Sequence, residues 1–100
     1  IMAVGDMFTE MSDVAASGTL DIQPASGAEV VINNIYHEYD IEVYRYDGTL
    51  DCLVATEVGG GVLSFINFRC NNTDRIRVKN TDSSNARMIG YDGIYTKAAS

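Results

Sequence analysis

Several residue types are scarce in this 100-residue chain, and each shortage narrows what the protein can do. His37 is the only histidine, which excludes a histidine-based metal cluster. It adjoins Glu38 and Asp40, so a catalytic carboxylate–imidazole pair is conceivable, but we expect a solvated histidine at a strand end. The two cysteines, Cys52 and Cys70, lack the Cys-x-x-Cys spacing of a zinc site. They could form a disulfide only if their strands were neighbours with suitable geometry. Since nothing in the sequence indicates export, a pair of small buried thiols is favoured.

Positive charge is also scarce. Seven Lys and Arg residues stand against fourteen Asp and Glu residues, which gives a net charge of −7. This balance argues against a general binder of nucleic acids or anionic membranes. No Lys or Arg precedes Arg45, and most of the positive charge follows Phe68. Opposite charges on the two halves would attract copies of the chain head to tail, although two differently charged solvated faces explain the same pattern.

Long apolar runs are missing. No segment has the roughly 20 consecutive apolar residues that a membrane-spanning helix needs. The first eight residues lack the basic region and the continuous apolar stretch of a secretory signal. Tryptophan is absent and tyrosine outnumbers phenylalanine, so we expect amphipathic aromatics near the surface.

What the chain does contain is β-sheet pattern. From Thr19 onward, apolar segments recur about every ten residues between turn signals, which is typical of a sandwich or barrel. Residues 75–80 alternate most clearly, with Ile76 and Val78 between charged residues. Asp47-Gly48 is the strongest hairpin signal. We predict an all-β domain over residues 19–97, an antiparallel β-sandwich or jelly roll of about seven or eight strands with an N-terminal arm.

Glycines in the last predicted strand carry a further expectation. Gly90 and Gly93 indicate bulges or a close approach of another backbone. The tripeptide Tyr46-Asp47-Gly48 recurs as Tyr91-Asp92-Gly93. Since the flanking residues do not repeat, we interpret the two as similar turns. Residues 98–100 are expected to form a tail.

Residues 1–18 differ from the rest and are treated as a separate arm. Met7, Met11 and Val14 recur at helical spacing, which predicts one or two turns of amphipathic helix. So short a helix must dock on something to persist, and Met suits adaptable contact surfaces. The segment is therefore either an arm that packs on a neighbouring subunit or a frayed terminus.

Carboxylates are the remaining candidates for chemistry. Without an Asp-x-Asp-x-Asp-Gly loop, a calcium site is not indicated, and alternate acidic residues on a strand usually face water. The glycines at 59–61 are not followed by Lys-Ser or Lys-Thr, so a flexible loop is expected in place of a phosphate cradle. We expect no catalytic activity, no metal and no cofactor. The acidic residues that could gather at one edge are Glu38, Asp40, Glu42, Asp47 and Asp51.

Several segments together resemble small accessory head proteins that decorate or cement the capsids of tailed bacteriophages. The resemblance covers roughly residues 18–97 and rests on strand and turn patterns. It implies a non-enzymatic virion protein, assembled in the host cytoplasm, that binds the major capsid protein on the outer capsid surface and forms an oligomer, commonly a trimer. The segments are 20–27, 31–36, 44–49, 76–80 and 89–93.

Two functions from different classes remain open. The first is the stabilisation of a capsid, and the second is a carbohydrate- or receptor-binding module, because exposed tyrosines can stack on sugars or anchor an interface. The tyrosines can equally cap the ends of the core. The candidate interface residues are Met7, Phe8, Met11, Val14, Tyr44 and Tyr46.

Overall fold

The computed structural model describes residues 3–99, and this part of the chain contains eight strands and no helix. The strands are β1 (Met7–Val14), β2 (Thr19–Ile22), β3 (Glu29–His37), β4 (Ile41–Tyr46), β5 (Asp51–Glu57), β6 (Gly61–Asn71), β7 (Arg75–Asn80) and β8 (Arg87–Lys97). No helix that could span a membrane is present among the described residues.

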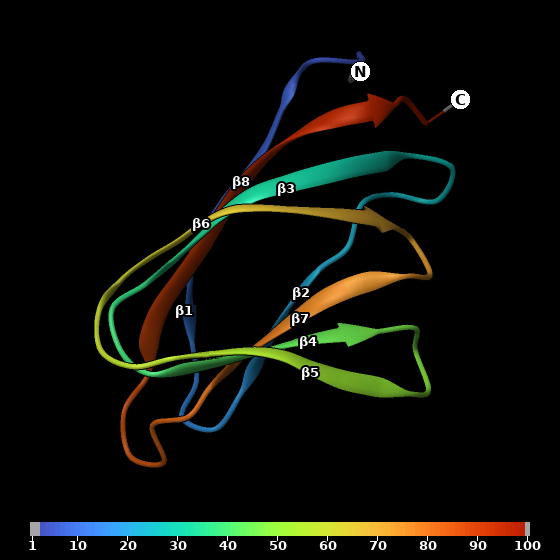
Figure 1. Cartoon of the computed structure of the whole chain (residues 1–100). Helices are drawn as coiled ribbons and strands as arrows, with labels where there is room; N and C mark the ends of the chain where they lie inside the picture. The colour runs from blue at the N-terminus through green and yellow to red at the C-terminus, as the bar shows by residue number, and fades with distance from the viewer. Residues whose placement is uncertain (1–2, 100) are drawn as a thin grey trace.

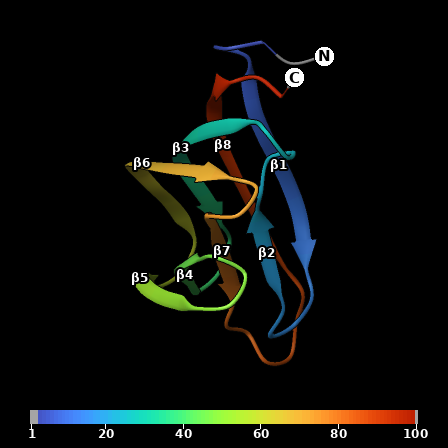
Figure 2. The same cartoon turned by 90° about the vertical axis from the view of Figure 1, so that its right-hand side faces the viewer.

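The strands form two four-stranded antiparallel sheets that face each other (Figure 1). Sheet A has the order β1-β8-β3-β6, and sheet B has the order β2-β7-β4-β5. Only β4 and β5 are both consecutive in the chain and paired, because every other connection crosses from one sheet to the other. This is the eight-stranded jelly roll, so the predicted all-β sandwich is confirmed. Figure 2 shows β1 beside β2 at one side of the sandwich and β5 and β6 at the other.

The core lies between the sheets and is made mainly of β-branched side chains. These residues alternate with outward-facing ones, as in β7, whose Ile76 and Val78 are fully buried. Burying one such side chain contributes about 1.5–3 kcal/mol to stability. The isoleucines that are buried most completely are Ile22, Ile32, Ile35, Ile41, Ile76 and Ile89.

The helix predicted near the N-terminus is wrong. Residues 7–14 form β1, which pairs with β8 along its whole length, from Met7 opposite Ile94 to Val14 opposite Arg87. The spacing of Met7, Met11 and Val14 fits a helix, but these residues lie on both faces of a strand. Phe8 points inward and packs on the rings of Tyr91 and Tyr95, while Met7 and Met11 point outward. The spacing that predicted a helix therefore arises from apolar residues on both faces of a strand.

The two similar tripeptides have different structures. Asp47-Gly48 makes the predicted β4–β5 turn, in which Gly48 has a φ of 98° and Asp47 Oδ1 accepts the backbone N–H of Leu50 at 2.7 Å. The second tripeptide is no turn, because it lies in the middle of β8. Gly93 is needed there since a Cβ would lie 2.1 Å from the carbonyl oxygen of Val31, which confirms the expected close approach.

Candidate functional site

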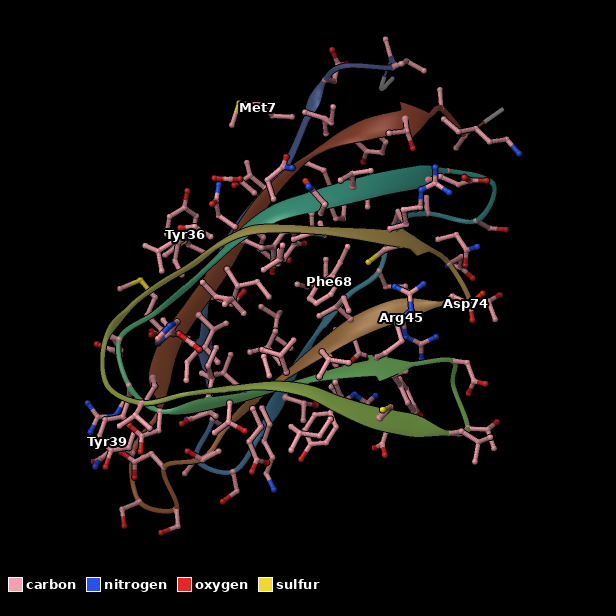
Figure 3. All side chains as sticks on the ribbon, viewed as in Figure 1. Met7, Tyr36, Tyr39, Arg45, Phe68 and Asp74 are labelled. Carbon is pink, nitrogen blue, oxygen red and sulfur yellow. The ribbon has the colours of Figure 1, made fainter. Side chains whose placement is uncertain are left out.

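The outer face of sheet A carries several exposed apolar side chains. Two apolar rows cross the strands: Met7, Ile94 and Val31 form one, and Met11, Tyr36 and Val62 form the other, with Gly90 between Met11 and Tyr36. Met88 lies beside the second row. In Figure 3, Met7 and Tyr36 point away from the space between the sheets. We call these residues, namely Met7, Met11, Val31, Tyr36, Val62, Met88 and Ile94, the methionine face.

A polar row separates the two apolar rows of the methionine face. Register places Thr9, Asp92, Asn34 and Ser64 side by side on β1, β8, β3 and β6. The Asp92 carboxylate accepts hydrogen bonds from Asn34 Nδ2 at 2.8 Å and from the Tyr36 hydroxyl. The hydrogen bond to Asp92 raises the pKa of Tyr36. A half-buried carboxylate at the centre of an apolar face is an acceptor for a partner's cation or amide.

A shallow depression of about 150 Å³ lies at one end of this face. Met11 and Met88 form its walls with Tyr36, and Glu38 lies at its rim. The backbone N–H of Met88 donates to Glu38 Oε1 at 2.6 Å, which fixes the carboxylate beside the depression. Flexible thioethers adapt to irregular partners, so this part of the face is suited to contact with another molecule.

The outer face of sheet B is charged, and Asp21, Arg75 and Arg77 on this face bind one another. Asp21 accepts two hydrogen bonds from Arg77, at 2.6 and 2.9 Å, and one from Arg75 at 3.3 Å. The hydrogen bond from Arg77 holds the pKa of Asp21 below its usual range. The guanidinium carbons of Arg77 and Arg75 lie 3.8 and 4.8 Å from the centre of the Tyr46 ring. Tyr44 donates to Glu42 Oε1 at 2.7 Å.

The six predicted interface residues therefore divide into three groups. Met7 and Met11 are exposed on the methionine face, whereas Phe8 and Val14 pack toward the core. Tyr44 and Tyr46 are half-buried and engaged within sheet B. The structure brings two of the six together on one exposed surface and leaves the two tyrosines on the opposite sheet.

Sequence reasoning predicted only Met7 and Met11 of the seven residues of the methionine face and also missed the central Asp92. Met88, Asp92 and Ile94 occupy alternate positions of β8, and this alternation was a usable signal once the strand had been predicted. It was overlooked because the Tyr91-Asp92-Gly93 tripeptide was interpreted as a turn. Tyr36 joins them only through the pairing of β3 with β8, which no local pattern reveals.

The edge strand β5 is a second exposed apolar surface. Leu53 and Val54 are 50% and 44% exposed, and Leu50 and Val58 at its two ends are 73% and 83% exposed. The strand pairs with β4 on one side only. It contains no Lys or Pro to prevent pairing with another chain.

The remaining candidates for chemistry are placed as follows. His37 is buried at the end of β3, not solvated as expected, and its Nδ1 lies 2.8 Å from the carbonyl oxygen of Gly59. Asp40 Oδ1 accepts the N–H of the same glycine at 2.7 Å, so both residues anchor the β5–β6 connection. Cys70 is a buried thiol, but Cys52 is exposed, which corrects the expectation for that residue. Within residues 3–99, no three His, Cys, Asp or Glu side chains gather closely enough to hold a metal ion.

Comparison of the sequence with models of known protein families and with curated proteins finds no match.

Proposed function

We propose that the protein is a non-enzymatic virion structural protein that binds and stabilises the outer surface of a phage capsid. The observation that carries the proposal is the contrast between its two outer faces. The methionine face has exposed apolar rows around a half-buried carboxylate, whereas Asp21, Arg75 and Arg77 on sheet B are bound to one another. Exposed apolar side chains gathered on one face of a small domain are typical of a site of interaction with another molecule. The major capsid protein is the proposed partner.

The fold and the net charge agree with this role. Eight-stranded jelly rolls occur in viral capsid proteins as well as in lectins, which is an analogy at the level of the fold alone. A decoration protein gains affinity from many copies acting together and needs no catalytic centre. A net charge of −7 keeps the surface that stays in water soluble.

Association between copies is part of the proposal, and β5 supplies the surface. A two-fold pairing of β5 with itself over its full length would place Asp51 opposite Glu57 of the other copy. Like charges directly opposite on paired strands are destabilising. A cyclic arrangement, in which β5 contacts a different surface of the next copy, avoids this repulsion and is compatible with a trimer.

Binding to capsids assembled from the major capsid protein of the same genome tests the proposal. The double variant Met11→Lys and Ile94→Lys changes the methionine face. Thr19→Lys on β2 and Thr73→Lys in the β6–β7 turn, both at exposed positions outside β5, make a control of equal net charge. We expect roughly a 10- to 100-fold loss of affinity for the first pair, as for truncated interface hot spots, and less than threefold for the control. A larger loss for the control would place capsid binding outside the methionine face, and a wild-type chain that does not bind capsids would overturn the proposal.

Carbohydrate binding is the second candidate, and one observation favours it. Tyr36, Asn34 and Asp92 combine an aromatic ring, an amide and a carboxylate on one exposed sheet face, a set of groups suited to a sugar. Tyr46 is a poorer candidate because two guanidinium groups cover its ring, and Tyr44 is a poorer one because its hydroxyl already donates to Glu42. A glycan array separates the candidates: glycan binding that is lost in Tyr36→Ala and kept in Tyr44→Ala would favour this function.

A further inference from the structure

The depression at the end of the methionine face has the size of a side-chain pocket. Its volume of about 150 Å³ is below the roughly 300 Å³ at which small-molecule sites begin. Met11, Tyr36 and Met88 give it apolar walls. One Leu, Met or Phe side chain from a partner is the occupant that such a volume and such walls favour.

The walls depend on the absence of a side chain at Gly90. A Cβ at this position would lie 1.9 Å from Met11 Sδ, so the Met11 side chain occupies the space above the glycine. Tyr36 lies opposite Gly90 on β3, on the far side of the same row. Met88 is held on the remaining side by its backbone pairing with Glu38, whose N–H donates to the Met88 carbonyl at 3.2 Å. His37 of β3 and Gly61 of β6 complete the lining, so four strands form the pocket.

The charges around the pocket are all negative. Glu38 lies at its rim, Asp13 is opposite Met88 in the β1–β8 register, and Asp92 is two residues beyond Gly90 on the same face. The nearby Arg87 turns to Asp82, to which its Nε donates at 2.8 Å. The described residues that line the pocket include no Lys or Arg.

The negative charge around the pocket favours a positively charged partner over a second copy of the chain. A second copy of the chain carries a net charge of −7 and presents the same acidic rim, so face-to-face association between copies is opposed. A partner with positive charge beside its apolar side chain is favoured, because complementary charges fix orientation and reject wrong partners.

We propose, building on the proposed function, that this pocket receives one apolar side chain from an exposed loop of the partner protein, and that Lys or Arg residues next to it in that loop pair with Glu38 and Asp92. The sulfur atoms of Met11 and Met88 contact the apolar side chain. The pocket is the specificity-determining part of the methionine face.

Methyl NMR on the full chain with ¹³C-labelled methionine methyl groups tests this directly. The probes are acetyl-Lys-Leu-Lys-amide and acetyl-Glu-Leu-Glu-amide. We expect the Met11 and Met88 methyl signals to shift saturably and the Met7 signal to shift less, with binding of the lysine peptide at least threefold tighter in low salt. This preference should shrink at high salt, where the charges are screened. The absence of saturable shifts, equal shifts at Met7, or equal affinity for the two peptides would overturn the proposal.

Capsid binding provides the second arm, with a control outside the methionine face. Met88→Lys should weaken binding at least tenfold, Thr73→Lys in the exposed β6–β7 turn less than threefold, and Met88→Leu should restore the wild-type affinity. If the wild type binds capsids and Met88→Lys does so equally well, the pocket is refuted while the capsid function stands. If the wild type does not bind capsids but the peptides bind as expected, the proposed capsid function is wrong and the proposed side-chain pocket is supported.

Discussion

The side chain of Met11 lies over Gly90 of the neighbouring strand, in the space where any other residue would carry its Cβ. The contact joins β1 to β8 on the methionine face, and it explains why a glycine stands in the middle of a long strand. A Cβ at Gly90 would also lie 2.7 Å from the carbonyl oxygen of Glu10, which belongs to the backbone and cannot simply rotate away.

Gly90→Ala is therefore expected to destabilise the fold by about 1–3 kcal/mol, the usual cost of overpacking, and to move the Met11 methyl group. Urea unfolding followed by circular dichroism measures the change. Gly61→Ala is the matched control in sheet A, because its Cβ would meet only the His37 ring at 4.0 Å. Equal losses in the two variants would contradict the packing of Met11 on Gly90.

The Asn80 side chain at the end of β7 hydrogen-bonds to the backbone at the end of β1 and in the β7–β8 loop. It is fully buried, and its Nδ2 donates to the carbonyl oxygens of Val14, Ala15 and Asn85 at 3.0, 3.2 and 3.1 Å. Its Oδ1 accepts the N–H of Asp82 at 3.0 Å. Asn80→Ala leaves these groups without their partner, so we expect a loss of roughly 2–4 kcal/mol in the free energy of unfolding. Asn72→Ala, which removes a single hydrogen bond to the Pro24 carbonyl at 3.1 Å, should cost only about 1 kcal/mol.

Asp82 makes the stability of the fold sensitive to acid. The N–H of Ser84 and the guanidinium of Arg87, each at 2.8 Å, hold its pKa at about 2, below the ordinary value of 3.8. Because the folded chain binds this proton less readily than the unfolded chain, the ionised group stabilises the fold above a pH of about 4, and this contribution is lost as the pH falls towards 2. Unfolding measured across this range should show the loss.

Two variants separate the sources of this acid sensitivity. Asp82→Asn should flatten the pH dependence of the free energy of unfolding between about pH 4 and pH 2. Arg87→Gln should flatten it only in part, because the backbone N–H of Ser84 still donates to Asp82. An Asp82→Asn profile that is parallel to that of the wild type would show that other carboxylates account for the acid response.

The sequence revealed those features of the fold that local pattern determines. The strand at 75–80 was found because its buried isoleucine and valine alternate with charged residues. The turn at Asp47-Gly48 was found because its side chain and its glycine meet the requirements of a turn by themselves. Both signals lie within a few residues of one another and depend on no distant partner.

Features set by distant partners were not accessible in this way. Met7 and Met11 lie four residues apart, which suits a helix as well as one face of a strand, and the presence of β8 decides between the two. Gly93 follows the same two residue types as Gly48, but the approach of the Val31 carbonyl, and not a turn, requires it. Most of the methionine face was missed for the same reason, because its members come from four strands that only the jelly-roll order places side by side.

The two cysteines are expected to differ sharply in reactivity. Cys52 is exposed on the edge strand β5, whereas Cys70 is buried, and burial raises the pKa of its thiol. Because the thiolate is the reactive form, a disulfide reagent at about pH 8 should label one cysteine rapidly and the second only as the chain unfolds. Cys52→Ser should abolish the rapid phase and Cys70→Ser should keep it, as mass spectrometry of the labelled chain would show. Rapid labelling of Cys70 in the native chain would mean that β6 opens readily from the core, and would contradict the burial of this residue.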